Sequence, residues 1–386
     1  ISACLVGSEM CIRDSCKMHR CEIPPHGLDR LLPVRNDPAK RLTGIVILAT
    51  IRDVAKAAGV STATVSAVVN GSAYVSVALK ARVMAAVKEL DYAPMSAARN
   101  LKRGRSQLIA LVVSDLANPF FARFVCAAEA AVTEWGYSLV LFNSDEKPEN
   151  EKRILSRVRA LSCDGLVWVP IEPAGRNEGR DGEGGTMPTV LFGRVVENER
   201  SDTVTIDNCS AARQVTNYLL DLGHRRIATI TGPLHLTTGR GRLDGMLEGM
   251  AQRGLAPEPR HIRDGAFREE VAYAAARDLM TEAEPPTAIY VANGVMALGV
   301  MRALADLGLS CPRDVSIAST DTIPGIGGLR PRLTRTEHPI ADMTREALRL
   351  LVDRIEARSP PGPRNIVFQP ALILGESCAP IAPSAH

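Results

Sequence analysis

The sequence lacks the motifs that mark the common enzyme classes. It contains no Gly-x-Ser-x-Gly nucleophile turn, no His-Glu-x-x-His zinc motif and no Walker phosphate loop, each of which carries a specific chemistry. Its glycine pairs, at positions 239/241 and 325–328, lack the flanking pattern of a dinucleotide-binding fold. We therefore predict that the protein is not an enzyme, has no catalytic residues and needs no cofactor.

Long apolar runs are also missing. No uninterrupted stretch approaches the roughly 18 residues that a membrane-spanning helix needs, and the first residues lack the layout of a signal peptide. The composition, 46% apolar and 23% charged, is typical of a soluble globular protein, and a length of 386 residues predicts two to three domains. We predict a cytoplasmic protein that does not bind a membrane.

Closely paired cysteines are absent. The nine Cys form no C-x-x-C pair, the spacing that many zinc sites use. The last five stand singly, which favours reduced thiols in a reducing compartment. The other four cysteines lie within the first 21 residues and are Cys4, Cys11, Cys16 and Cys21. A metal site that they form with His19 and His26 is an alternative, but the irregular gaps between these cysteines favour no bound metal.

Residues 1–49 lack the sustained periodicity of a helix or a strand. They contain four prolines and do not begin with Met, and residues 6–15 resemble translated sequencing-adaptor DNA. We interpret residues 1–49 as a disordered or non-native extension and expect order to begin at Thr50.

What the sequence does have is an uneven distribution of charge. Nine Lys or Arg against three acidic residues give residues 50–106 a net charge of +6, whereas residues 107–386 carry −5. A compact basic block on an acidic body is typical of a module that binds a polyanion.

The basic block has the pattern of two short helices joined by a glycine turn. Helices are predicted over residues 51–58 and 62–70, and Gly59 can take the left-handed conformation that ends the first. A third helix follows from Ser76, with an apolar stripe that closes a small core. Together they predict an all-α helix-turn-helix domain over residues 50–93. The capping residues are Thr50 and Ser61, and the stripe is Val83, Ala86, Val87 and Leu90.

At these residues the chain resembles the lactose/galactose/purine repressor (LacI/GalR) family of bacterial transcriptional regulators. The resemblance continues to about residue 378, and it implies a short hinge helix over residues 94–107 that orders on DNA. The runs that carry it in the block are Thr50–Ala55, Ala58–Ser61, Thr64–Ser66, Val69–Gly71, Glu89–Pro94 and Ala97–Lys102. The implied DNA-contacting residues are Thr50, Ser61, Thr62, Ala63, Thr64, Ser66, Ala67, Asn70, Tyr92, Leu101 and Lys102.

Parts of this assignment have alternatives. Ala67 stands where the family commonly has Arg or His, so no strong guanine contact is expected from that position. The resemblance implies that Leu101 wedges into the minor groove and kinks the duplex; the alternative is an ordinary core residue of a linker helix. For the whole block, the alternative is a small helical domain that binds protein rather than DNA.

From Gln107 the pattern changes to short β-branched runs that alternate with helical segments. Near-continuous apolar strands separated by helices predict parallel sheets covered on both faces, in two lobes with a ligand between them. The predicted strands are 108–113, 138–142, 165–169, 189–192, 226–230, 288–291 and 315–318. The predicted helices are 121–135, 152–160, 211–222, 242–253, 269–280 and 295–307.

The resemblance implies the same α/β architecture, a two-lobed body like that of periplasmic binding proteins over residues 108–378. It also implies three crossings between the lobes, which we place near Asp207, Cys311 and Pro339. The predicted lobes are then lobe 1, residues 108–207 and 312–339, and lobe 2, residues 208–311 and 340–378.

The resemblance further implies ligand-binding residues in the cleft. Aromatic rings would stack on a sugar or base ring, and Arg242 would bind a hydroxyl or carboxylate with its planar donor fork. Gly294 stands where the family usually has Asp, so either other residues replace that carboxylate or the ligand is not a typical neutral hexose. The implied ligand-binding residues are Phe120, Phe121, Thr238, Arg242, Phe267, Asn293 and Asp321.

The resulting hypothesis is an effector-responsive, sequence-specific DNA-binding transcriptional regulator. We expect a repressor that binds a pseudo-palindromic operator as a homodimer and responds to a small sugar-like metabolite. An exported solute-binding protein is the alternative that the body alone would suit. The sequence leaves open whether the effector is an inducer or a co-repressor.

Overall fold

The computed structural model describes residues 49–71, 74–92, 105–171, 187–196, 201–321 and 330–381. The chain divides into two compact units, a head within residues 1–94 and a body within residues 95–386. The predicted extension, apart from Ala49, lies outside the described residues, and so do positions 94–104 of the predicted hinge.

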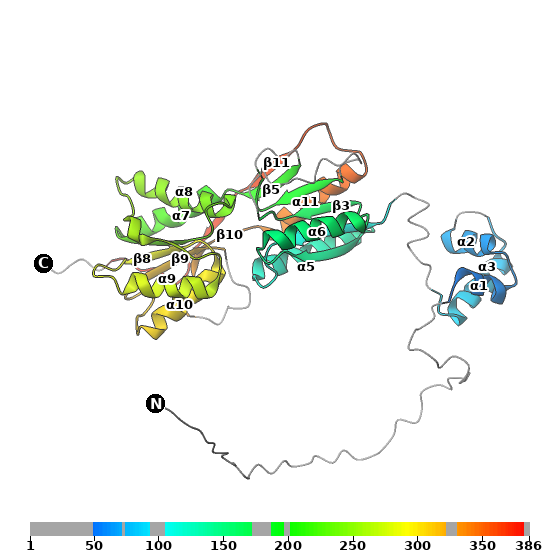
Figure 1. Cartoon of the computed structure of the whole chain (residues 1–386), viewed down its shortest axis with the longest axis horizontal. Helices are drawn as coiled ribbons and strands as arrows, with labels where there is room; N and C mark the ends of the chain where they lie inside the picture. The colour runs from blue at the N-terminus through cyan, green and yellow to red at the C-terminus, as the bar shows by residue number, and fades with distance from the viewer. Residues whose placement is uncertain are drawn as a thin grey trace, which may run out of the picture. The chain divides into compact units, whose positions relative to one another are not determined.

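The head is built from three helices, α1 (Ile51–Ala58), α2 (Thr62–Asn70) and α3 (Val77–Glu89) (Figure 1). The predicted bounds of the first two helices are confirmed. The Thr50 side chain accepts a hydrogen bond from the Asp53 backbone N–H and Asp53 returns one, so the two form a capping box. Gly59 ends α1 in the left-handed conformation, at φ +61°. Ser76 precedes α3, but its side chain makes no capping hydrogen bond.

A small apolar core holds the three helices together. Arg82 of α3 reinforces it, because its guanidinium donates to the Ala58 carbonyl at 2.5 Å and to the Gly59 carbonyl at 3.3 Å. This cation is therefore occupied in fixing the turn between α1 and α2. The buried residues are Val54, Ala55, Ala58, Val65, Val68, Val83 and Ala86, with Val87 and Leu90 partly buried beside them.

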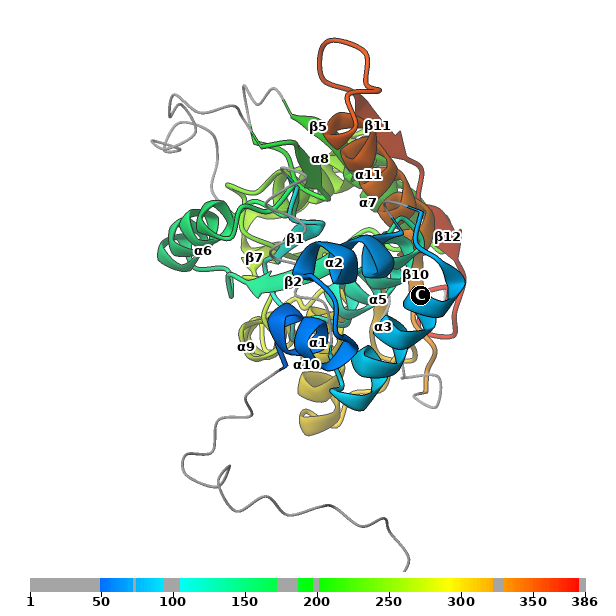
Figure 2. The same cartoon turned by 90° about the vertical axis from the view of Figure 1, so that its right-hand side faces the viewer.

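The first lobe of the body is a six-stranded parallel sheet in the order β11-β5-β4-β3-β1-β2. Helices α5 and α11 cover one face and α6 covers the other, and Figure 2 shows α6 and α11 on opposite sides of β1. The strands are β1 (Leu108–Val113), β2 (Ser138–Asn143), β3 (Gly165–Trp168), β4 (Thr189–Phe192), β5 (Asp202–Ile206) and β11 (Asn365–Phe368). The helices are α5 (Pro119–Glu134), α6 (Pro148–Ala160) and α11 (Ile340–Ile355).

The second lobe repeats this plan in the order β12-β10-β9-β8-β6-β7, with β12 antiparallel to β10. Helices α7 and α8 cover one face, and α9 and α10 cover the other. The strands are β6 (Ile227–Thr231), β7 (Ile262–Asp264), β8 (Ala288–Val291), β9 (Ser316–Thr320), β10 (Thr334–Glu337) and β12 (Ala371–Ile373). The helices are α7 (Asn208–Asp221), α8 (Thr237–Ala251), α9 (Glu269–Met280), α10 (Gly294–Asp306) and the short 3-10 helix η2 (Pro259–His261).

The assignment of residues 312–378 to the lobes was wrong. Residues 312–321 and 330–339 belong to the second lobe, because β9 pairs with β8 and β10 pairs with β9. Most of residues 340–378 belong to the first lobe, because α11 packs against β3, β4 and β5 and β11 pairs with β5.

The chain passes between the lobes at three places. Two coincide with the predicted positions near Asp207 and Pro339, where β5 leads into α7 and β10 leads into α11. The third joins β11 to β12 at residues 369–370 and not at Cys311, which lies within the second lobe and packs against its core.

A buried carboxylate joins three separate segments of the first lobe. Asp202, at the start of β5, accepts hydrogen bonds from Arg354 of α11 at 2.7 Å and from Arg364 at 2.8 Å. Its side chain is fully buried, whereas those of the two arginines are about three-quarters buried. Burial raises the pKa of Asp202, but the hydrogen bonds from Arg354 and Arg364 outweigh it and hold the pKa below its ordinary value.

Replacing Asp202 with Asn should therefore destabilise the body strongly. The change leaves two guanidinium groups without their carboxylate, and we expect the free energy of unfolding at pH 7 to fall by about 3 kcal/mol in urea denaturation. Asp221→Asn is the matched control, because Asp221 pairs with Arg253 at 2.6 Å but its side chain is 60% exposed. That variant should lose less than about 1 kcal/mol. Equal losses in the two variants would contradict the role assigned to Asp202.

Candidate functional site

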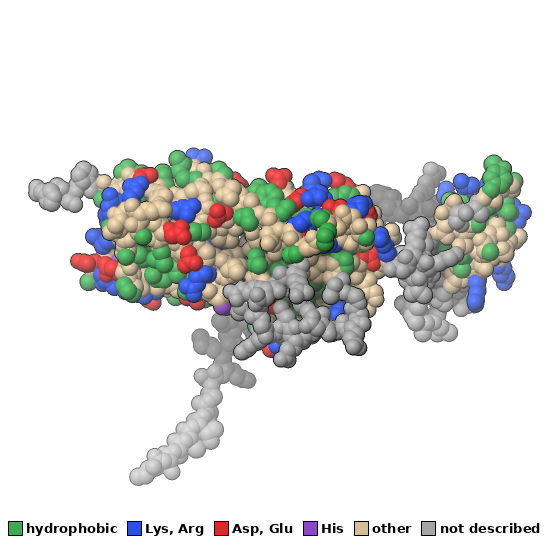
Figure 3. Space-filling model, turned by 90° about the horizontal axis from the view of Figure 1, so that it is seen from above, with side chains coloured by type: hydrophobic (Ala, Val, Ile, Leu, Met, Phe, Trp, Pro, Cys, Tyr) green, Lys and Arg blue, Asp and Glu red, His purple; other side chains and the backbone are tan. Residues whose placement is uncertain are grey.

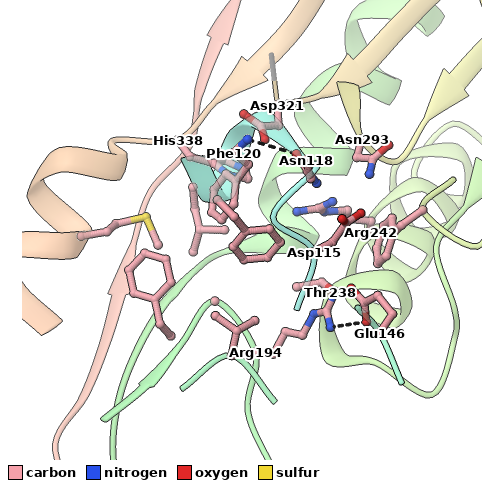
Figure 4. A pocket seen from close by; sticks show the side chains of 17 residues that line it. Asp115, Asn118, Phe120, Glu146, Arg194, Thr238, Arg242, Asn293, Asp321 and His338 are labelled. Carbon is pink, nitrogen blue, oxygen red and sulfur yellow. Dashed lines mark hydrogen bonds and ion pairs between the residues drawn. The ribbon is translucent and has the colours of Figure 1, made fainter. Parts of the chain in front are cut away.

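A pocket lies between the two lobes of the body (Figure 4). All seven residues implied as ligand-binding line it. The lining residues are Asp115, Asn118, Phe120, Phe121, Glu146, Val169, Phe192, Gly193, Arg194, Ile206, Thr238, Arg242, Phe267, Asn293, Asp321, His338 and Met343.

Parallel strand pairing explains why these residues meet. The carboxyl ends of neighbouring parallel strands lie at the same edge of a sheet. In the first lobe, Asp115 follows β1, Glu146 follows β2 and Arg194 follows β4. In the second lobe, Asn293 follows β8 and Asp321 follows β9. The pocket is thus formed by the loops and helix starts that leave the strand ends of both sheets.

Aromatic rings form part of the wall. Phe120 and Phe121 start α5, and their rings meet edge to face with centroids 5.1 Å apart. The ring of Phe192, at the end of β4, stacks on that of Phe124 at 3.9 Å. Such rings give a ligand an apolar surface on which to stack.

Arg242 is held rigidly at the polar side of the pocket. It is only 7% exposed, its Nε donates to Asn208 Oδ1 at 2.9 Å, and its Nη1 donates to the Ala292 carbonyl at 2.5 Å. Burial lowers the pKa of this guanidinium, but an arginine keeps its charge. Since two of its five N–H groups are used, others can be offered to a ligand.

Phe267 lies beside two guanidinium groups that come from opposite lobes. Arg194 of the first lobe lies 5.8 Å from the ring centroid and Arg242 of the second lies 5.9 Å from it, both within cation–π range. The ring can occupy this position because residue 232 is glycine, as a Cβ there would overlap the ring. Phe267 itself has a φ of +55°, a conformation that costs a non-glycine residue free energy and often occurs at functional sites.

Contacts between the lobes border the pocket. Arg268 of the second lobe pairs with Asp115 and Asp145 of the first, at 3.3 Å each, and the Val195 N–H donates to Thr237 Oγ1 at 3.2 Å. Within the first lobe, Glu146 accepts two hydrogen bonds from Arg194, at 2.7 and 2.9 Å. The ion pairs of Arg268 and the hydrogen bond from Val195 to Thr237 thus link loops of the two lobes beside the pocket.

His338 lines the pocket at the second crossing between the lobes. It is 3% exposed, and neither ring nitrogen has a hydrogen-bond partner among the described residues. Burial, together with the charges of Arg242 and Arg123, lowers its pKa from 6.5 to about 3. At neutral pH the imidazole is therefore uncharged, with one nitrogen a donor and the other an acceptor.

Several pocket residues were not predicted from the sequence, among them Asp115, Glu146, Arg194 and His338. The first three are polar residues that closely follow predicted strands, and His338 precedes Pro339, where a crossing was predicted. Polar residues at strand ends and crossings were thus the available signal. No signal in the sequence shows that Glu146 pairs with Arg194, 48 positions away.

Most of the predicted DNA-contacting residues of the head lie in α2 or at its N-cap, whereas Thr50 caps α1 and Tyr92 follows α3. Thr50, Ser61, Thr62, Ala63 and Asn70 are exposed, whereas Thr64, Ser66, Ala67 and Tyr92 are partly buried. Ser61 caps α2 by accepting from the Thr64 N–H at 3.1 Å, and Tyr92 packs against the head core. Figure 3 shows basic side chains on the surface of the head. Leu101 and Lys102 lie outside the described residues.

The described residues contain no cluster of three or more His, Cys, Asp or Glu side chains that could hold a metal ion. The four cysteines of the first 21 residues lie outside the described part. Cys126, Cys163, Cys209, Cys311 and Cys378 are free thiols. Within the described ranges, no helix is both long and apolar enough to cross a bilayer.

The buried neutral state of His338 predicts a specific dependence of stability on pH. Because its folded pKa is far below 6.5, acid protonates the unfolded chain first, and the free energy of unfolding falls as the pH drops from 6.5 towards 3. The contribution of His338 between pH 6.5 and 5 should be about 2 kcal/mol. Urea unfolding at both values should show a smaller loss for His338→Gln than for the wild type. Equal losses in the two proteins would show that His338 is not held neutral.

Comparison with known proteins gives the same division of the chain. Residues 50–95 match the family described as bacterial regulatory proteins, lacI family, and residues 216–378 match a periplasmic binding protein-like domain. The ribose operon repressor of Escherichia coli K12 is 35% identical over 308 residues, which cover 80% of this chain and 93% of that protein. The repressor PurR of Haemophilus influenzae PittEE is 34% identical, with 80% and 91% covered.

Solved structures of transcriptional regulators are also similar to this chain. A lac repressor dimer bound to operator and the anti-inducer ONPF has a TM-score of 0.74 at 26% identity and covers 86% of this chain and 99% of its own. A complex of the regulator CelR with cellobiose has a TM-score of 0.63 at 31% identity, with 85% and 99% covered. The small helical head, the two-lobed α/β body and these similarities lead to one conclusion: the chain belongs to the lacI family of bacterial regulatory proteins.

Proposed function

We propose that this protein is a cytoplasmic transcriptional repressor that binds a pseudo-palindromic operator as a homodimer and is controlled by a small sugar-like metabolite. The observation that carries the proposal is the convergence of all seven implied ligand-binding residues on one pocket between the lobes, in a chain whose other unit is a basic helix-turn-helix head. Such a pocket serves a regulator, because its occupancy can alter how the two lobes sit.

On the DNA side, α2 is the recognition helix. Thr62 and Ala63 are exposed at its start, where recognition helices contact base edges in the major groove. Their small side chains allow close approach, and their methyl groups suit thymine methyls. The remaining head residues position the helix on the phosphates, and these are Thr50, Ser61, Thr64, Ser66, Ala67, Asn70 and Tyr92.

The hinge supplies the second DNA contact. Leu101 wedges into the minor groove at the operator centre, and Lys102 contacts the backbone beside it. The hinge of one subunit lies beside its copy from the second subunit on the DNA. An operator with a pyrimidine–purine step at its centre kinks most easily and is therefore preferred.

On the effector side, Phe120, Phe121 and Phe267 stack on the ligand ring, and Arg242 donates to its oxygens. Thr238, Asn293 and Asp321 complete the polar contacts. The similarity to a ribose operon repressor and to a regulator solved with cellobiose supports a sugar as effector. The ion pairs of Arg268 with the first lobe favour the arrangement of the lobes seen in this structure. The effector therefore acts on an equilibrium between lobe arrangements that these ion pairs already bias.

A mobility-shift experiment with the purified full chain and a library of genomic fragments tests the function. We expect selective retention of fragments with an inverted repeat, protection of both half-sites in a footprint, and affinity that falls steeply with salt. Adding the effector then shows its sign, since an inducer weakens retention and a co-repressor strengthens it. Absence of salt-sensitive, site-selective retention would overturn the proposal.

Two variants should separate the two sites. Arg242→Ala removes buried, charge-assisted hydrogen-bond donors, so effector affinity should fall about a hundredfold while operator affinity stays within about twofold of the wild type. Leu101→Ala removes the wedge, so operator affinity should fall about tenfold while effector affinity is unchanged. Calorimetry for the effector and mobility shift for the operator measure the two effects, and parallel losses in either variant would contradict the separation.

A further inference from the structure

Two polar side chains in the pocket have no hydrogen-bond partner among the residues that the structure describes. Both ring nitrogens of His338 and the hydroxyl of Thr238 are buried without a hydrogen bond among the described residues, and both residues line the pocket. A buried polar group without a partner costs free energy, and such exceptions call for a specific explanation. These atoms are shielded from bulk water, so a molecule held in the pocket is the partner that can satisfy them.

Two of the arginines in or beside the pocket already form ion pairs with carboxylates of the protein. Arg194 pairs with Glu146 at 2.7 Å, and Arg268 pairs with Asp115 and Asp145 at its border. The guanidinium of Arg242 lies in the field of the Asp321 carboxylate. Arg194 and Arg268 are therefore already paired with carboxylates, and an anionic ligand would bring a further negative charge towards Asp115, Glu146 and Asp321, which all line the pocket.

The hydrogen-bonding groups demand a ligand that both donates and accepts. Arg242 only donates and Asp321 only accepts, whereas a neutral imidazole and a threonine hydroxyl each do both. A hydroxyl group can meet any of these, because it carries one donor and two acceptor lone pairs. The aromatic rings of Phe120 and Phe192 add an apolar surface, which suits the C–H faces of a ring.

We propose that the pocket selects an uncharged, polyhydroxylated ring, and that His338 is a specificity-determining residue, which donates to one ligand hydroxyl and accepts from another. The proposal rests on the proposed function and deepens it from a sugar-like metabolite to a neutral sugar. It resolves the departure at Gly294, because Asp321, Asn293 and His338 supply the polar contacts that an aspartate there would make.

His338 lies in a segment that connects the two lobes. The residue lies between β10 of the second lobe and α11 of the first, and its ring meets that of Phe120 edge to face at 5.8 Å. A ligand that forms hydrogen bonds with His338 thus contacts a segment that connects the two lobes. The same residue therefore takes part in ligand binding and in the connection between the lobes.

Thermal-shift measurements on the full chain test the ligand class. The probes are neutral sugars with their charged counterparts: D-ribose, D-ribose 5-phosphate and D-ribonate; D-glucose, glucose 6-phosphate and gluconate; D-galactose; cellobiose; and hypoxanthine. Because a ligand of the folded state raises the melting temperature, we expect stabilisation by one or more neutral sugars. Stabilisation confined to the phosphates, the acids or hypoxanthine, or by no probe, would overturn the proposal.

Calorimetry with the stabilising sugar then tests His338. His338→Leu removes both hydrogen bonds and should weaken binding about thirtyfold or more, whereas His338→Gln keeps a donor and an acceptor and should bind within about tenfold of the wild type. His235→Leu, at an exposed histidine, is the control and should bind as the wild type does. Equal affinities for His338→Leu and the wild type would overturn the role of His338.

Monodeoxy analogues of that sugar separate recognition from a structural effect. The analogue that lacks the hydroxyl facing His338 should bind the wild type about tenfold or more weakly than the parent sugar, but should bind His338→Leu as tightly as the parent does. Deoxy losses that are the same in both proteins would show that His338 acts only on the fold. The operator mobility shift needs no sugar, so failure of these tests with intact operator binding refutes the ligand class and leaves the regulator function standing.

Discussion

Parallel pairing of strands is the constraint on which the site depends. In each sheet, neighbouring parallel strands end at one edge, so the residues that follow them are brought together although they are far apart in the sequence. Glu146 and Arg194 meet in this way in the first lobe, and Asn293 and Asp321 come to the same pocket in the second. The three crossings then bring the two edges to one pocket, and neither lobe alone supplies all of its walls.

Charge balance shapes the pocket as much as its walls do. Guanidinium groups from opposite lobes lie within 6 Å of the single ring of Phe267, and like charges so placed repel each other. Glu146 and Asp321 offset that repulsion, one from each lobe. The pocket therefore has charged groups at its edge but offers a ligand a nearly neutral environment. The uncharged ring of His338 is part of that environment.

The sequence predicted those structural features that depend on interactions between residues close together in the chain. Thr50, Gly59 and Ser61 act through neighbours within a few positions, so the bounds of α1 and α2 followed from them. The resemblance to a known family supplied seven residues that the structure brings together in the lining of one pocket. What failed was the assignment of late segments to lobes, because the pairing of β11 with β5 joins residues about 160 positions apart. The short, half-exposed strand β11 has only three apolar residues in a row, too few by themselves to predict a strand.

The interleaved path of the chain has a consequence for synthesis. The first lobe is completed by β11 and the second by β12, and these two strands lie only a few residues apart near the carboxyl terminus. Proteins are made from the amino terminus at about 5 to 20 residues per second. The ribosome therefore releases both closing strands almost at the same moment, and neither half of the body can mature first, whereas the head is contiguous and can fold long before either.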